Sequence, residues 1–141
     1  MAPSLEYWGA IPVNPAVPKT LVGTCEMIAH EAAHNALFGL SPRQFFVWNS
    51  DEERHKSPLR DDPRRLDGIH HAVFVSARMH FAVTEIIRSG RLGAEQVDAA
   101  RQSLAIDLRL FVEGKAVLEA HARFPPEGRA ILDAAAAHVA A

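Results

Sequence analysis

The segment from Leu66 to Arg88 restricts the fold most, because its apolar residues lie on nearly every side of a helix. A helix that is apolar all round must be covered by protein on most of its surface. We therefore expect a helix that begins at Leu66 or Asp67, ends at Ser89-Gly90 and occupies the centre of the domain. The apolar residues that support this prediction are Ile69, Val73, Phe74, Val75, Met79, Phe81, Val83, Ile86 and Ile87.

Three further helices are expected to surround this central one. The first covers about residues 19–38, with Thr20 as its cap and Gly39 as its stop. The second covers residues 94 to about 123 and is broken by Pro125-Pro126, after which residues 127–140 form a short closing helix. The prediction is a mainly α fold, a small helical bundle in which the first two long helices pack together.

The remaining segments are predicted to be irregular parts of one 141-residue domain. Residues 1–18 contain four prolines and should form an extended lead-in packed on the domain surface. Residues 41–65 are polar, apart from an FFVWN stretch that fits either a short strand or a buried anchor. A loop of this length inside a compact domain is uncommon and often functional.

Composition excludes several classes of function. The net charge of −2 gives no reason to expect nucleic acid or a membrane surface as a partner. The single cysteine, Cys25, excludes an internal disulfide framework and a cysteine-rich zinc site. The first residues lack the basic and apolar regions of a signal peptide, so we expect a cytoplasmic protein. The oligomeric state stays open, with a homodimer among the alternatives.

The pattern His30-Glu31-x-x-His34 lies inside the first predicted helix. Residues i and i+4 share a helical face, so His30 and His34 can both reach one metal ion at about 2.0–2.1 Å. Glu31 is rotated by about 100° and would stand beside the ion, where a general base acts in metallopeptidases. Two unpaired buried histidines would destabilise the helix packing, which favours a ligand role over a chance pattern.

A third ligand would distinguish the families that use this pattern. The long metzincin form requires glycine and histidine where this chain has Leu37 and Leu40. A thermolysin-like site has only Glu85 to offer, without its usual supporting residues. The better candidates are the adjacent His70 and His71, which point about 100° apart, so that only one should face the site. We expect His55, His80, His121 and His138 to have no ligand role.

The segment HKSPLRDDPRRLDGIHHAVFVSARM, residues 55–79, resembles part of the HEXXH-motif proteins associated with peptide modification in natural-product clusters. In that family the H-E-x-x-H helix is followed by Pro-aromatic-Arg-x-Asp-Pro-Arg-Pro and then by Gly-x-x-His. Here residues 58–65 read PLRDDPRR and residues 68–71 read GIHH. Leu59 replaces the aromatic residue and Arg65 replaces the last proline. The resemblance covers about residues 20–88, and family members are generally longer.

Some members of this family look like Fe(II)- and 2-oxoglutarate-dependent hydroxylases that oxidise the β-carbon of a residue in a peptide. The resemblance implies His30, His34 and His71 as the iron ligands and a peptide or carrier-tethered amino acid as the substrate. Three protein ligands leave three octahedral positions free, enough for a bidentate 2-oxo acid and dioxygen. The site would lie between the two long core helices.

The distal carboxylate of 2-oxoglutarate requires a cation, for which a bidentate arginine is the best match. Arg60 and Arg64 lie in the loop before His71, and Arg78 lies two turns along the same helix. The competing interpretation is that Arg60 and Arg64 pair with Asp61 and Asp62 in a solvated run of charges.

Two other functions compete with the oxygenase. In a small zinc peptidase, Glu31 would deprotonate a zinc-bound water. In a metal-stabilised or binding module, the histidines would be structural. In the oxygenase, by contrast, Glu31 would orient a ligand or water rather than act as the hydrolytic base.

Overall fold

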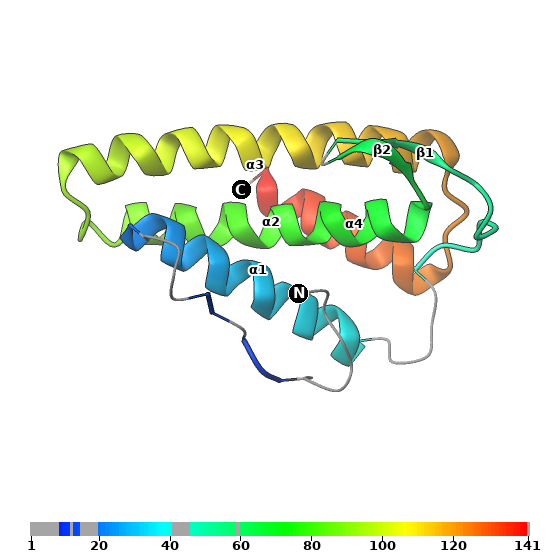
Figure 1. Cartoon of the computed structure of the whole chain (residues 1–141), viewed down its shortest axis with the longest axis horizontal. Helices are drawn as coiled ribbons and strands as arrows, with labels where there is room; N and C mark the ends of the chain where they lie inside the picture. The colour runs from blue at the N-terminus through cyan, green and yellow to red at the C-terminus, as the bar shows by residue number, and fades with distance from the viewer. Residues whose placement is uncertain (1–8, 12, 15–19, 41–45, 59, 141) are drawn as a thin grey trace.

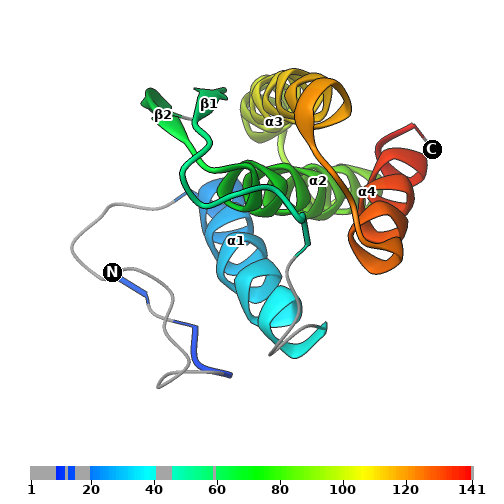
Figure 2. The same ribbon diagram turned by 90° about the vertical axis from the view of Figure 1, so that its right-hand side faces the viewer.

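Helix α2 (Leu66–Arg88) lies at the centre of the bundle, as its apolar surface predicts. In the computed structural model it packs against α1 (Leu21–Leu40), α3 (Ala94–His121) and α4 (Pro126–Val139). Figure 2 shows these three helices arranged around α2. Ile69 and Val83 of α2 have no exposed surface. The predicted mainly α bundle is therefore confirmed.

The structure describes residues 9–11, 13–14, 20–40, 46–58 and 60–140. Besides the four helices, these residues form an antiparallel hairpin of strands β1 (His55–Ser57) and β2 (Arg60–Arg64), in which His55 pairs with Arg64 and Ser57 with Arg60 (Figure 1). None of the helices in this part of the chain combines the length and the apolar character needed to cross a membrane.

The ends of the helices follow the predicted signals with one exception. The Thr20 hydroxyl accepts a hydrogen bond from the Gly23 N–H at 3.0 Å, which caps α1 as expected. Gly39 does not stop α1, which continues to Leu40. An exposed glycine in a last turn costs only about 1 kcal/mol relative to alanine, which is too little to end a helix by itself. Helix α2 ends at Arg88, and Gly90 adopts a φ of +66° after it.

The hairpin corrects the prediction that residues 41–65 are irregular. Strand β2 is exposed along nearly its whole length and contains Pro63, so it lacks the alternation that identifies a half-buried strand. The hairpin is held at the close approach of α2 and α3. A Cβ on Gly114 of α3 would lie 2.5 Å from Val73 Cγ2 and 3.3 Å from Pro58 Cγ. The hairpin has no apolar face of its own, and it is positioned by the close packing of Pro58 and Val73 on Gly114 of α3.

The other irregular segments are only partly described. Residues 46–49 form no strand, and Val47 is buried, so the FFVWN stretch is an anchor where it is described. Phe45 and the rest of residues 41–45 lie outside the described residues, as does most of the predicted lead-in. Within the lead-in, the Gly9 N–H donates to Asn35 Oδ1 at 3.0 Å, and Asn35 Nδ2 donates to the Ala10 carbonyl at 2.9 Å.

Candidate metal centre

Three histidines meet where α1 packs against α2. His30 and His34 lie one turn apart on α1, and His71 lies in the second turn of α2. His34 Nδ1 is 2.5 Å from His71 Nε2, and His34 Nε2 is 3.0 Å from His30 Nε2. The ring centroids of each pair are 4.6 Å apart. The structure thus brings together the three residues that the sequence selects as ligands.

Burial keeps the imidazoles of His34 and His71 neutral. Burial, followed by the neighbouring His34, His70 and His30, lowers the pKa of His71 to about 4. The pKa of His34 is also lowered, first by burial and then by His30, while Glu31 acts in the opposite direction. Neutral imidazole is the form that binds metals, because its unprotonated nitrogen carries a free lone pair.

The three side chains are suitable metal ligands, but their present arrangement does not form a metal site. Three neutral imidazoles are ligands that both zinc and ferrous iron accept. Across residues 9–140, apart from the undescribed positions, no group of three or more His, Cys, Asp or Glu side chains is arranged to hold an ion. His34 accounts for this, because it turns Nδ1 toward His71 and Nε2 toward His30. Binding of one ion would require His34 to offer a single nitrogen.

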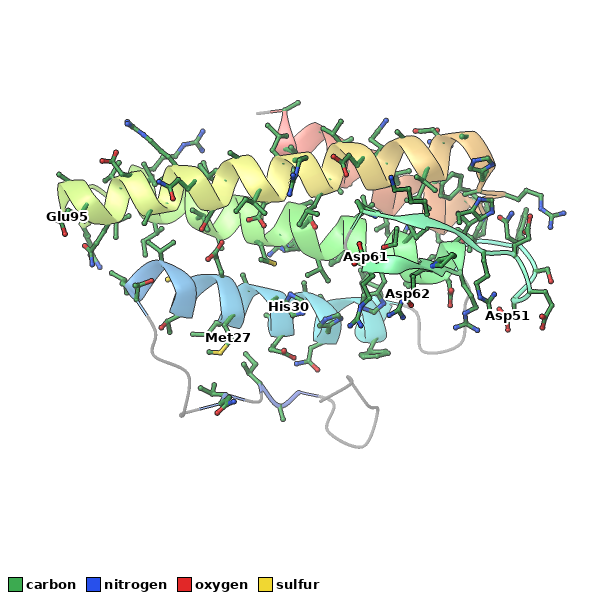
Figure 3. The ribbon with its side chains drawn as sticks, turned by 45° about the horizontal axis from the view of Figure 1, so that its top comes forward. Met27, His30, Asp51, Asp61, Asp62 and Glu95 are labelled. Atoms are coloured by element: carbon green, nitrogen blue, oxygen red, sulfur yellow. The ribbon has the colours of Figure 1, made fainter. Side chains whose placement is uncertain are left out.

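A pocket of about 840 Å³ opens beside the three rings and is lined by α1, α2, α3 and the hairpin. Pockets of 300–1,000 Å³ hold small-molecule ligands. Glu31 lines the pocket together with His30, His34 and His71. Figure 3 shows His30 on α1 and the two aspartates of the hairpin, Asp61 and Asp62. The remaining lining residues are Phe38, Ser57, Arg60, Arg64, Arg65, Asp67, Gly68, Ala72, Val75, Ser76, Met79, Asp107 and Leu110.

The arginines considered for 2-oxoglutarate lie in different places. Arg60 and Arg64 line the pocket, whereas Arg78 does not and instead places its guanidinium over the Phe81 ring, 5.3 Å from the centroid. Arg64 Nε is 3.0 Å from Asp62 Oδ2, the pairing that the competing interpretation expects. Arg60 has no ion-pair partner among the described residues. It is therefore the most available cation in the pocket.

Arg65 also lines the pocket, although the sequence gives no reason to select it. Its guanidinium contacts Asp67 Oδ2 at 2.9 Å and Asp51 Oδ1 at 3.3 Å. These contacts neutralise Arg65 and fix it at the start of α2.

His70 has different surroundings from the adjacent His71. It is fully buried, its Nε2 donates to the Gly128 carbonyl at 3.0 Å, and its ring stacks on Phe46 at 5.1 Å. The predicted divergence of the two side chains is therefore observed, with His71 on the side of His30 and His34. The other histidines do not line the pocket; His55 stacks on His121, and His138 contacts Phe81.

Asp107 on α3 is a pocket residue that the sequence reading missed. It is only 2% exposed, and its Oδ2 has no hydrogen-bond partner among the described residues. Burial, and to a smaller extent the nearby Glu26, raises the pKa of its carboxyl to about 7. A sequence signal does exist, because Asp107 occupies a position in the buried stripe of α3 that otherwise carries Ala100, Phe111, Gly114 and Leu118.

Comparison with known proteins adds no relative, because no protein-family model, curated protein or solved structure matches the chain. The resemblance of residues 20–88 to the HEXXH-motif proteins stays a prediction.

Proposed function

We propose that the chain is an Fe(II)- and 2-oxoglutarate-dependent oxygenase that hydroxylates an amino-acid side chain, at Cβ by the family resemblance, in a peptide or carrier-tethered substrate. The observation that carries the proposal is the meeting of three imidazoles beside a large pocket with a basic edge. Three protein ligands leave room for a 2-oxo acid and dioxygen at the same ion. A cytoplasmic location, where the co-substrate is available, fits this proposal.

His30, His34 and His71 would hold the metal, and ferrous iron held there would supply the activation of dioxygen. His34 has the most demanding part, because it must give up one of its two present contacts. The low pKa of His71 keeps this ring unprotonated throughout the neutral range, so proton competition for the site is weak.

Arg60 is the residue that we assign to the distal carboxylate of 2-oxoglutarate. It lines the pocket from β2 and has no carboxylate partner among the described residues. Arg64 can contribute only by exchanging Asp62 for the co-substrate. A guanidinium is suited to this task, since its parallel N–H groups match the two oxygens of a carboxylate.

Glu31 supports a second candidate function, a zinc-dependent peptidase. It lines the pocket beside His30 and His34, where a carboxylate could deprotonate a metal-bound water. In the oxygenase the same carboxylate would orient a ligand or water. The Glu31→Gln variant separates these functions, because it should abolish hydrolysis but only weaken oxidation.

The test is succinate formation by anaerobically purified protein that is supplied with Fe(II), 2-oxoglutarate and then oxygen. We expect turnover that needs all three and that is lost in His71→Ala. His138→Ala is the matched control, because this exposed histidine does not line the pocket. Absence of succinate, together with zinc-dependent cleavage of casein that Glu31→Gln abolishes, would replace the oxygenase by the peptidase.

A further inference from the structure

A second pocket of about 360 Å³ adjoins the histidine pocket. It is lined by Val47, Trp48, Asn49, Ser50, Asp51, Arg65, Leu66 and Asp67. Arg65 and Asp67 line both pockets, so the ion pair between them forms a shared wall. If a bound peptide places one residue beside the three histidines, its next residue can therefore enter the second pocket.

The floor of this second pocket is apolar and its rim is polar. Val47 and Leu66 are 4% and 2% exposed, while the Trp48 side chain stands open to solvent at 63%. Asp51 and Asp67 both contact Arg65, whose single positive charge compensates one of their two negative charges. An apolar floor beside an open indole favours a large apolar side chain over a charged one.

The backbone that carries Trp48 is fixed, although its side chain is exposed. The Trp48 N–H donates to the Arg123 carbonyl at 2.7 Å. The Asn49 side chain donates to the His121 carbonyl at 3.0 Å and accepts from the Arg123 N–H at 2.7 Å. Two residues before Trp48, Phe46 packs so closely on α4 that a Cβ on Gly128 would lie 2.0 Å from its carbonyl oxygen.

Trp48 is exposed, but the segment that carries it is anchored to the rest of the fold. The neighbouring Val47 is buried, and three hydrogen bonds join Trp48 and Asn49 to the end of α3. The backbone that carries the indole is therefore fixed before a ligand arrives, and this lowers the entropic cost of binding. Tryptophan is also among the residues that contribute most to protein and peptide recognition.

We propose that the Trp48 pocket is a specificity subsite that binds a large apolar side chain, preferably aromatic, next to the modified residue of a peptide substrate. The inference rests on the proposed peptide substrate. It commits to a peptide because the two pockets share Arg65 and Asp67, so both can be occupied by adjacent residues of one chain.

The experiment uses the full chain and a set of capped pentapeptides of alanine with one phenylalanine at each position in turn. All-alanine and lysine-containing peptides of the same length serve as references, and affinity is measured by calorimetry without oxygen. We expect the best phenylalanine peptide to bind at least tenfold more tightly than all-alanine, since its larger side chain removes more apolar surface from water. Trp48→Ala should reduce the preference to less than threefold.

Val112→Ala is the matched control, because it removes an exposed apolar side chain of α3 that does not line the pocket. It should leave the preference unchanged. A Trp8→Phe variant leaves Trp48 as the single tryptophan, and its emission should shift when the phenylalanine peptide binds. Succinate formation is measured separately, so a failed oxygenase with a retained phenylalanine preference would overturn the proposed function alone.

Three results would overturn the subsite: equal affinity for phenylalanine and alanine peptides, tighter binding of the lysine peptide, or a preference that survives Trp48→Ala. Failure of every peptide to bind would overturn it too, because the peptide is the occupant proposed.

Discussion

His70 and His71 are consecutive residues of α2 in opposite environments. His70 is fully buried, donates to the Gly128 carbonyl and stacks on Phe46 between α2 and α4. His71 faces α1 and contacts the imidazole of His34 beside an open pocket. Both have lowered pKa values, mainly because of burial. Burial and a lowered pKa therefore do not separate a structural histidine from a candidate ligand, whereas the partner does.

The partner of His70 is a backbone carbonyl, which only a ring N–H can satisfy. The partner of His71 is another unprotonated imidazole, which carries the lone pairs that a metal requires. The His70 side of α2 therefore stabilises the fold, and the His71 side carries the candidate metal ligands. We expect substitutions on the His70 side to reduce the stability of the fold and substitutions on the His71 side to reduce metal affinity.

Gly128→Ala should have the largest effect, on the His70 side. The added Cβ would lie 2.0 Å from the Phe46 carbonyl oxygen, so the backbone of one segment must move. We expect the free energy of unfolding to fall by about 3 kcal/mol or more in urea titrations. Gly68→Ala is the control, since its Cβ would meet nothing within 4 Å, and it should be neutral or stabilising. Equal effects of the two would contradict the close packing of Phe46 on α4.

His70→Ala should come next, with a loss of about 2–4 kcal/mol in the free energy of unfolding. It creates a cavity and leaves the Gly128 carbonyl without its donor. His70→Gln retains a donor and should recover part of the loss. If His70→Ala unfolds no more easily than His138→Ala, the structural role of His70 is wrong.

Asp107 should contribute a smaller, pH-dependent effect on the pocket side. Its folded-state pKa of about 7 lies above the ordinary aspartate value of 3.8, so between these values the native state binds more protons than the unfolded state. Stability should therefore fall as the pH rises from about 4 to about 7. Asp107→Asn lacks this titration and should be more stable than the wild type at pH 8.

Urea titrations at pH 5 and pH 8 check this dependence. Asp98→Asn, an exposed aspartate of the same helix, controls for the loss of one negative charge. A wild-type profile that Asp107→Asn does not change would show that another group titrates.

Asp62→Asn should have the smallest effect on folding. It breaks an ion pair whose side chains are 40% and 64% exposed, and such pairs contribute at most about 1 kcal/mol. Thermal unfolding should hardly change. The substitution also frees Arg64, so 2-oxoglutarate binding measured by calorimetry should tighten if Arg64 takes part, and Arg60→Gln should weaken it in either case.

The helices, and the position of His30 and His34 on one helical face, were predictable because they depend on residues close together in the sequence. Apolar periodicity places α2 at the centre, and i, i+4 spacing aligns two histidines whatever surrounds them. The hairpin was missed because β2 is exposed and is held by packing at Gly114, which is far away in the sequence. Asp107 was missed because its proximity to the pocket depends on how α3 packs. Helical geometry separates His70 from His71, but only the fold reveals their partners.

The most direct test is Co(II) titration under argon, followed by visible absorption, of the wild type, His71→Ala and His70→Gln. Cobalt reports ligand number through its spectrum and stands in for iron without reacting with oxygen. We predict one bound ion in the wild type and in folded His70→Gln, and an affinity at least 100-fold lower in His71→Ala. Unchanged cobalt binding by His71→Ala, or no binding by the wild type, would contradict a metal centre formed by His30, His34 and His71.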